Sequence, residues 1–425
     1  MLIELFGRNF GPFRDEFRLS MLATDIDPGD KRGVVEVPIE GDDEPLRLLR
    51  CAAIYGPNAS GKSWLLRAAS ALGYLVKHSA AESSDEPLGP YVPFALDEES
   101  RTKPVQLGVR AVIQRAVYEY WVEFEKTRFT QERLVRLVPA EETVLFERRG
   151  QDVTGPWTKE EQFALLARSF RPNALLLSLA DRLAPSVAGG LAVSIRRLLG
   201  YFDFAGLSFP PFATSRAARR AHEDDAGFGA WLRSWLRAAD VGIVGYKVRE
   251  SSTYFELERS AEPERAQRRE RPVLELSFVH AGARNQAELR WSQESLGTLK
   301  VVALAPYIYD LTHGRERRAY FIDEVGASVH PVLLGSLIRH FNCETPAEQV
   351  RGQLIFATHE TSILDGEARS APLRRDQIYL TEKGNDGASR LYSVAEFKER
   401  NNLNLRKRYL EGRYGALPSP GPFGA

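Results

Sequence analysis

The residues best suited to chemistry in this chain form one glycine-rich stretch, Gly56-Pro57-Asn58-Ala59-Ser60-Gly61-Lys62-Ser63. Its spacing, G-x-x-x-x-G-K-S, is that of a phosphate-binding loop. The glycines let successive backbone N–H groups face one anion, and a following helix would add the partial positive charge of its N-terminus. Lys62 would bring a positive charge to the β- and γ-phosphates, and the Ser63 hydroxyl suits Mg²⁺. We therefore predict a site for a nucleoside triphosphate.

The flanking residues supply the elements that this loop requires. An apolar run, Ala52-Ala53-Ile54-Tyr55, precedes the loop, and a helix-like run, Trp64-Leu65-Leu66-Arg67-Ala68-Ala69, follows it. A strand, a glycine-rich turn and a helix start form the context in which the motif binds phosphate. A tight glycine-rich turn without a ligand is the alternative, and this context disfavours it.

Two acids follow an apolar run far downstream, in Arg318-Ala319-Tyr320-Phe321-Ile322-Asp323-Glu324. A strand would place them at its carboxyl end, where ligands bind in open α/β sheets. Asp323 would hold Mg²⁺ directly or through water. Glu324 would polarise the attacking water. Acids after a buried strand are common, but downstream of a phosphate loop they are its expected partners.

A second apolar run, Gln353-Leu354-Ile355-Phe356-Ala357, ends in Thr358 and His359. A single histidine is more often structural than functional. Here it ends a strand that we expect in the same sheet as the phosphate loop. We therefore favour a contact between His359 and the γ-phosphate.

A third stretch, Glu294-Ser295-Leu296-Gly297-Thr298, lies just before a helical run from Leu299 to Leu311. Ser295 is a typical N-cap residue. Gly297 permits close approach of the backbone to an anion. Together they predict a second helix N-terminus suited to phosphate. An ordinary N-cap remains the alternative.

The composition sets the broad class of the protein. Lys plus Arg and Asp plus Glu are equal at 57 each, so the net charge is zero, and hydrophobic residues make up 43% of the chain. This balance argues against a strongly basic nucleic-acid protein, although a local basic patch stays open. Two cysteines, Cys51 and Cys343, are too few for a disulfide framework or a cysteine zinc site. The N-terminus does not have the pattern of a signal peptide, and we see no run long enough to cross a bilayer. We expect a soluble cytoplasmic protein without a membrane partner.

The four motifs together, in this order, resemble the head of an ATP-binding-cassette (ABC) ATPase of the SMC/RecF/OLD-like kind. More narrowly, the chain resembles P-loop ATPases of bacterial abortive-infection and phage-defence systems, such as the AAA-family ATP-binding subunit of AbiL-type systems. The likeness spans nearly the whole chain. It is carried by the stretches IELFGRNFGPFRDEF, GPNASGKSWLL, ESLGT, IDEVGASVHP, ATHETSILD, RRDQIYLTEK and YLEGRYGALP.

The resemblance implies an α/β fold: a P-loop NTPase head with a mixed sheet, helices and an antiparallel β lobe, carrying a mostly helical insertion. Residues 1–155 would form the N-terminal half of the head, residues 156–240 the insertion, and residues 241–425 the C-terminal half. Two features depart from the pattern. His330 stands where transporter-type cassettes usually carry an Asp, and neither Gln106 nor Gln114 has convincing context for a Q-loop residue.

The resemblance also implies a function. ATP and Mg²⁺ would bind at the phosphate loop, and a head-to-tail homodimer would supply Ser295 and Gly297 from the second copy, within a dimer or a larger oligomer. The chain would hydrolyse ATP as the sensor or regulatory subunit of an anti-phage defence system. Its effector, a nuclease or toxin from the same operon, would be a separate protein.

A RecF/SMC-like ATPase that binds DNA in repair or chromosome maintenance is the alternative. The neutral net charge and the lack of a long heptad pattern disfavour it. A small-molecule P-loop kinase would explain neither Ser295 nor His359. The long insertion disfavours a transporter cassette.

Overall fold

The structure is a computed structural model that describes residues 1–26, 30–83, 86–138, 141–203, 210–223, 227–251, 273–366, 371–397, 404–419 and 421. The chain divides into two compact units. Unit 1 comprises Met1–Phe202, Leu311–Val325 and Gly335–Ala425. Unit 2 comprises Asp203–Asp310 and Gly326–Leu334.

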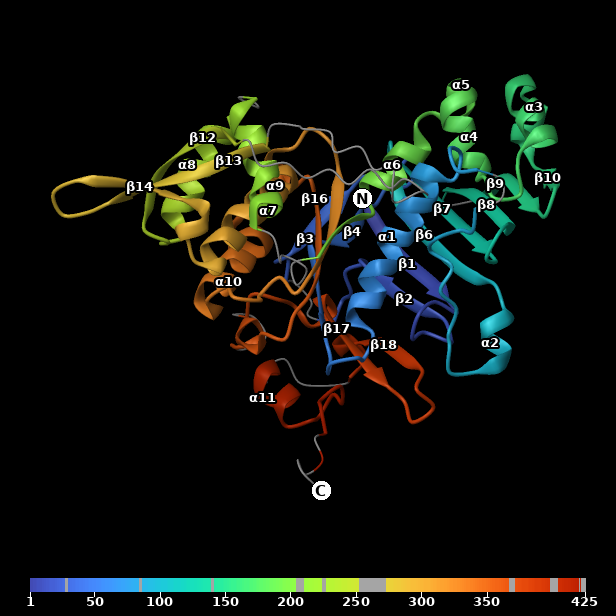
Figure 1. Cartoon of the computed structure of the whole chain (residues 1–425). Helices are drawn as coiled ribbons and strands as arrows, with labels where there is room; N and C mark the ends of the chain where they lie inside the picture. The colour runs from blue at the N-terminus through green and yellow to red at the C-terminus, as the bar shows by residue number, and fades with distance from the viewer. Residues whose placement is uncertain are drawn as a thin grey trace, which may run out of the picture. The chain divides into compact units, whose positions relative to one another are not determined.

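A six-stranded sheet of order β11-β15-β16-β5-β17-β18 carries the phosphate loop (Figure 1). The pairs β15–β16, β16–β5 and β5–β17 are parallel, and β17–β18 is antiparallel. Every residue of β5 and β16 is buried, which explains why these strands are continuous apolar runs rather than alternating ones. The strands are β5 (Cys51–Tyr55), β11 (Gly200–Asp203), β15 (Arg318–Asp323), β16 (Gly352–Ala357), β17 (Ile378–Lys383) and β18 (Ser389–Ser393).

A seven-stranded antiparallel sheet of order β10-β9-β8-β7-β6-β1-β2 forms the β lobe of unit 1. The stretch 105–147, rich in β-branched and aromatic residues, becomes its central meander. The strands are β1 (Leu2–Arg8), β2 (Phe17–Ser20), β6 (Val105–Ile113), β7 (Ala116–Phe124), β8 (Phe129–Val138), β9 (Glu141–Arg149) and β10 (Asp152–Thr154). A separate pair, β3 (Val34–Val37) and β4 (Leu46–Leu49), is also antiparallel.

Helix α1 (Lys62–His78) joins the two sheets through one hydrophobic core. Its buried residues include Leu65, Leu66 and Leu72, which share that core with Leu107 of the β lobe and Ile355 of the parallel sheet. Apolar residues three and four positions apart lie on one helix face, which explains the burial of this stripe. Both sheets therefore contribute to the packing that fixes the start of α1 (Figure 1).

Further helices of unit 1 follow the β lobe along the chain. A buried ion pair of the lobe, Glu132–Arg148 at 3.8 Å, holds the segment that begins α4. Glu132 accepts the backbone N–H groups of Leu176 and Leu177, and Arg148 donates to the carbonyl of Ala174. The helices that follow the lobe are α3 (Glu161–Ser169), α4 (Leu176–Leu183), α5 (Pro185–Ala188) and α6 (Leu191–Arg197); besides α1, unit 1 also contains α2 (Glu98–Thr102) and α11 (Leu405–Leu410).

Unit 2 combines helices with a three-stranded antiparallel sheet of order β12-β13-β14. Helix α9 contains Pro306, which cannot donate a backbone hydrogen bond. The indole N–H of buried Trp235 donates to the carbonyl of Val301, five residues before that proline, at 3.1 Å. The elements are α7 (Pro210–His222), α8 (Phe228–Ala238), β12 (Ile243–Ser251), β13 (Val273–Ala281), β14 (Gln286–Arg290), α9 (Leu296–His313) and the first turn of α10 (Pro331–Arg339).

The predicted α/β class is confirmed, including the mixed sheet and the antiparallel β lobe. The apolar stretch 46–55 forms two strands, β4 and β5, rather than one continuous strand. Buried Arg50 separates them and donates to the carbonyl of Val34 at 3.3 Å, so β4 pairs with β3 while β5 enters the parallel sheet. The predicted insertion, 156–240, contains helices α3 to α8 and strand β11, whereas the compact units divide near residue 202. The domain boundaries at 156 and 240 stay a prediction.

Helices long and apolar enough to cross a bilayer do not occur among the residues that the structure describes.

Candidate functional site

The site lies at the carboxyl edge of the parallel sheet, where β5, β15 and β16 end side by side. Two backbone hydrogen bonds continue the alignment of these strands beyond the ladder. The N–H of Val325 donates to the carbonyl of Ala357, and the N–H of Thr358 donates to the carbonyl of Ile54, each at 3.2 Å. These bonds keep the segments that follow the three strands next to one another.

The phosphate loop leaves β5 through a conformation that glycine favours. Gly56 has φ +150°, and a Cβ there would lie 2.3 Å from the carbonyl oxygen of Thr381 on β17. The hydroxyls of Ser60 and Thr381 are hydrogen-bonded at 2.6 Å. Gly61, with φ +110°, is the N-cap position of α1. Pro57 is half-buried and Asn58 and Ala59 are exposed, so the middle of the loop is accessible to a ligand.

Lys62 is buried at the start of α1 and points back into the loop. Its Nζ donates to the carbonyls of Gly56 at 2.9 Å and Pro57 at 3.1 Å. Burial lowers the pKa of Lys62, and the negative charges of Glu324 and Asp323 oppose that shift. Ser63 is the next residue of the first helical turn and is half-buried. The ammonium is thus held where a phosphate on the loop would meet it.

Asp323, Glu324 and His359 follow the carboxyl ends of β15 and β16; β16 pairs with β5, and β15 pairs with β16 on its other side. Asp323 is the last residue of β15 and is 3% exposed. Glu324 follows with φ +51°, a left-handed conformation that is uncommon for a residue other than glycine. The His359 Nε2 lies 3.5 Å from the Glu324 carboxylate, and their side chains are 46% and 25% exposed.

The charges around His359 favour its neutral form. Burial, and after it the positive charge of Lys62, lowers the pKa of His359 below its ordinary value of 6.5, while Glu324 and Asp323 act in the opposite direction. A neutral imidazole donates one hydrogen bond and accepts one. Lys62, Asp323, Glu324 and His359 therefore form one electrostatically linked group, although they lie far apart in the sequence.

Sequence reasoning missed the residues that support this group. Thr381 contacts both Gly56 and Ser60, and the hydroxyl of Tyr55 donates to the carbonyl of Glu360 at 3.0 Å. Thr381 lies within the stretch RRDQIYLTEK, but only the pairing of β17 with β5 brings it to the phosphate loop. From the sequence alone, Tyr55 is simply the last residue of an apolar run.

Ser295 and Gly297 belong to unit 2, where they form the start of α9. The Ser295 hydroxyl accepts the N–H of Thr298 at 3.1 Å, so it caps the helix. A Cβ on Gly297 would lie 2.4 Å from the carbonyl oxygen of Ser328. The carbonyl of Ser328, also in unit 2, therefore lies close to the backbone of Gly297, and the contact between Gly297 and a phosphate stays a prediction. The preceding Glu294 is hydrogen-bonded to His280 of β13 at 2.6 Å.

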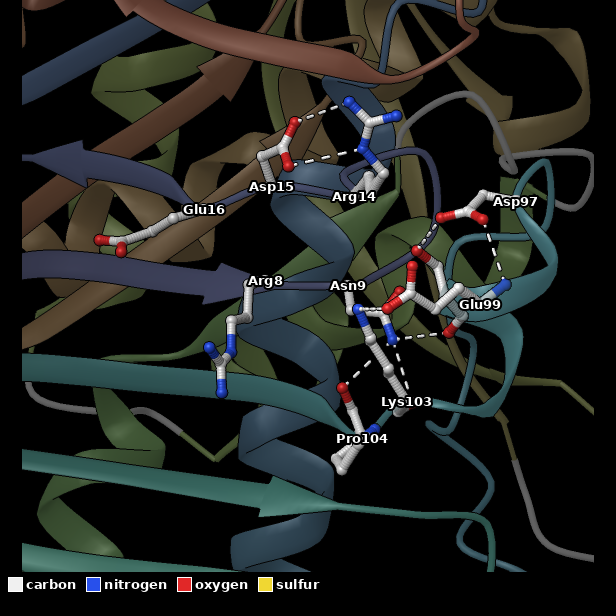
Figure 2. A pocket seen from close by; sticks show the side chains of 10 residues that line it. Arg8, Asn9, Arg14, Asp15, Glu16, Asp97, Glu99, Lys103 and Pro104 are labelled. Carbon is white, nitrogen blue, oxygen red and sulfur yellow. Dashed lines mark hydrogen bonds and ion pairs between the residues drawn. The ribbon is translucent and has the colours of Figure 1, made fainter.

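A separate cavity of about 790 Å³ lies beside the β lobe (Figure 2). Its charged groups are already paired within the chain: Arg8 with Glu123, Arg14 with Asp15, and Lys103 with Glu99. The buried Asn9 amide donates to three backbone carbonyls. This cavity contains no predicted site residue and offers no unmatched charge to a phosphate. Its lining residues are Arg8, Asn9, Arg14, Asp15, Glu16, Asp97, Glu99, Ser100, Lys103 and Pro104.

The side chains at the sheet edge fit a magnesium ion as well as a polyphosphate. Mg²⁺ prefers hard oxygen ligands, usually one or two carboxylates together with phosphate oxygens and water. Asp323 is a buried carboxylate whose charge reaches Lys62, and Ser63 adds a hydroxyl at the start of α1. The loop amides, the buried ammonium and the two acids provide both signs of charge that a metal–nucleotide complex requires.

A parallel sheet with a phosphate loop after one strand, a histidine after the adjacent strand and two acids after the strand beyond it defines the class of P-loop ATPases. The chain belongs to the family described as "AAA domain, putative AbiEii toxin, Type IV TA system", whose sequence model matches residues 51–365. That match runs from β5 to the end of the loop after His359, so it includes all of the predicted site residues.

Two solved structures are similar to this chain. One is an SMC head bound to the C-winged helix domain of ScpA, with 12% identity, coverage of 96% of this chain and 99% of that chain, and a TM-score of 0.48. The other is the recombination mediator protein RecF of the RecFOR pathway, with 10% identity, coverage of 92% and 98%, and a TM-score of 0.31. No curated protein matches the chain.

Proposed function

We propose that the protein binds ATP with Mg²⁺ and hydrolyses it to ADP and phosphate. The observation that carries this proposal is the meeting of Lys62, Asp323, Glu324 and His359 at one edge of the parallel sheet. These residues come from three separate stretches of chain, and a structural role for each would not require them to meet. Their combination of a cation, two acids and a neutral imidazole suits phosphoryl transfer to water.

Each residue has a role in this proposal that its surroundings support. Lys62 and the N–H groups of residues 56–63 bind the phosphates. Ser63 and Asp323 would hold Mg²⁺, which neutralises phosphate charge when it is bound. Glu324, partly exposed and 3.5 Å from His359, orients a water molecule for in-line attack. His359 donates a hydrogen bond to the γ-phosphate from its neutral form.

We further propose that two copies close over two ATP molecules in a head-to-tail dimer. Ser295 and Gly297 of one copy would then face the phosphate loop of the other. The accessible start of α9 supports this proposal, because Leu296, between the two residues, is 43% exposed. Binding of ATP would favour the closed dimer, and hydrolysis would release it.

In the cell, we propose a regulatory role in anti-phage defence, in which the nucleotide state controls a separate effector. The family description, which refers to a putative toxin and a toxin–antitoxin system, supports a setting of this kind. The described residues include no cluster of three or more His, Cys, Asp or Glu side chains that could hold a metal. Co-purification with the product of a neighbouring gene would support an effector. Toxicity of this chain expressed alone would contradict it.

Replacement of Glu324 by Gln tests the ATPase directly. The variant should bind ATP with nearly wild-type affinity and hydrolyse it about 100-fold or more slowly, in the range expected for loss of a general base. A matched control is Glu344→Gln, because Glu344 is also paired with a histidine, His340 at 3.3 Å, but lies on the surface outside the site. Turnover should be measured with radiolabelled ATP and affinity by calorimetry. Equal turnover by wild type and Glu324→Gln would remove Glu324 from the mechanism.

A further inference from the structure

The loop that carries His359 is held at its start by two hydrogen bonds. The Thr358 hydroxyl accepts the N–H of Glu360 at 3.0 Å, and the carbonyl of Glu360 accepts the hydroxyl of Tyr55 at 3.0 Å. These contacts lie on both sides of His359 in the sequence. The orientation of the imidazole therefore depends on them, because its own side chain is nearly half exposed.

Tyr55 occupies a special place in this arrangement. It is the last residue of β5, directly before Gly56, and only 1% exposed. Burial raises the pKa of Tyr55 well above its ordinary value, so the hydroxyl keeps its proton and acts as a donor. One rigid side chain thus connects the strand that begins the phosphate loop with the residue that follows His359.

The far end of the same loop is held by the C-terminal helix α11 (Figure 1). Asn404 caps α11 through the N–H of Lys407 and also donates to the carboxylate of Asp365 at 2.9 Å. Arg406 pairs with Asp365 at 3.2 Å. The rings of Tyr409 and Tyr55 lie 5.7 Å apart. A helix of six residues is not stable by itself in water, so α11 depends on these contacts together with the burial of Leu405 and Tyr409.

From these contacts we infer that Tyr55 is a positioning residue for His359, and that α11 supports it from the other end of the loop. This inference rests on the proposed ATPase function. Tyr55 itself touches no substrate; it acts by holding the backbone of Glu360 at a fixed distance from the phosphate loop. Without its hydroxyl, the loop from Thr358 to Asp365 would have more freedom, and His359 would spend less time in hydrogen-bonding range of the γ-phosphate.

The test is Tyr55→Phe, which removes only the hydroxyl. We expect kcat for ATP to fall about fivefold, the size of one neutral hydrogen bond, with KM and the Kd of ATP unchanged. The matched control is Tyr379→Phe on the neighbouring strand β17. Its buried hydroxyl also donates to a backbone carbonyl, that of Ser20 at 2.8 Å, but not in the His359 loop. Because the Tyr379 hydroxyl also accepts the N–H of Ser20 at 3.1 Å, the control should lose at least as much stability as Tyr55→Phe and keep its kcat.

A double-mutant cycle with His359→Ala shows whether Tyr55 acts through the histidine. In the His359→Ala background, Tyr55→Phe should have no further effect on kcat. Arg406→Ala should likewise lower kcat when His359 is present and have no further effect in the His359→Ala background. Its effect should be smaller than that of Tyr55→Phe because the Arg406–Asp365 ion pair is exposed. A kcat loss that is equal in both backgrounds, or equal in Tyr55→Phe and Tyr379→Phe, would overturn the inference. If the wild type does not hydrolyse ATP, or if His359→Ala keeps the wild-type kcat, the proposed function itself is refuted.

Discussion

Replacement of Gly56 by Ala should separate the phosphate loop from β17. A Cβ at this position would lie 2.3 Å from the carbonyl oxygen of Thr381, 2.5 Å from its hydroxyl and 2.7 Å from the hydroxyl of Ser60, whereas real Cβ atoms stay at least 3.0 Å away. Overpacking of a well-packed site costs about 1–3 kcal/mol. A residue forced into a glycine conformation costs about 1–3 kcal/mol more. The sum is about 2–6 kcal/mol.

The loop should relieve this clash by moving away from β17, since the sheet backbone has less freedom. If even 2 kcal/mol of that cost falls on the nucleotide-bound form, ATP affinity drops about 30-fold. Isothermal titration calorimetry with ATP measures the affinity, and thermal unfolding reports the stability. Gly89→Ala is the control, because no atom lies within 4 Å of its added Cβ.

A second variant distinguishes the backbone clash from the side-chain clash. Thr381→Ala removes the hydroxyl contact but leaves the carbonyl oxygen in place, so it should not rescue Gly56→Ala. Wild-type ATP affinity in Gly56→Ala, together with unchanged unfolding, would refute the packing argument. Full rescue by Thr381→Ala would show that the hydroxyl rather than the carbonyl fixes the loop.

Three further predictions concern the dimer, the histidine and the β lobe. Ser295→Arg should abolish ATP-dependent dimers in sedimentation while nucleotide binding persists; dimers that survive would argue against a trans contact. The pKa of His359 is lowered, so its imidazole becomes protonated only when the pH falls below the ordinary histidine pKa of about 6.5. The ATPase should therefore stay active down to about that pH and lose activity below it. The same shift means that this histidine destabilises the folded state as the pH falls through that value, because the unfolded chain takes up the proton first. Glu132→Ala should lower the free energy of unfolding by about 3–5 kcal/mol, because it leaves the Arg148 guanidinium buried without its carboxylate partner. Urea denaturation measures this change, and a loss below about 1 kcal/mol would contradict a structural role for the pair.

The sequence was most informative where residue type and spacing are fixed by local geometry. The phosphate loop from Gly56 to Ser63 requires glycine at positions of unusual φ, and the structure has positive φ at both Gly56 and Gly61. The buried strands β5, β15 and β16 were readable because strands covered on both faces are apolar throughout. The N-cap role of Ser295 also follows from its type and position, and the bond to Thr298 confirms it.

Other features were not readable because they depend on which strands become neighbours. The break at Arg50 between β4 and β5 has no local signal: its guanidinium donates to the carbonyl of Val34, and the strands on either side enter different sheets. Thr381 is an ordinary strand residue until β17 pairs with β5. The contact between Gly297 and Ser328 likewise follows from packing within unit 2.

By itself, the sequence determined that this protein has a phosphate loop, two acids and a histidine at the ends of buried strands, and a capped helix after Ser295. Each of these depends on short-range chemistry: backbone torsion, hydrogen-bonding capacity and apolar patterning. Only the tertiary structure showed that Lys62, Glu324 and His359 form one electrostatically linked group and that Tyr55 and α11 hold the histidine loop. The physical reason is that parallel strands distant in sequence align their carboxyl ends at one edge, and no local pattern states which strands these are.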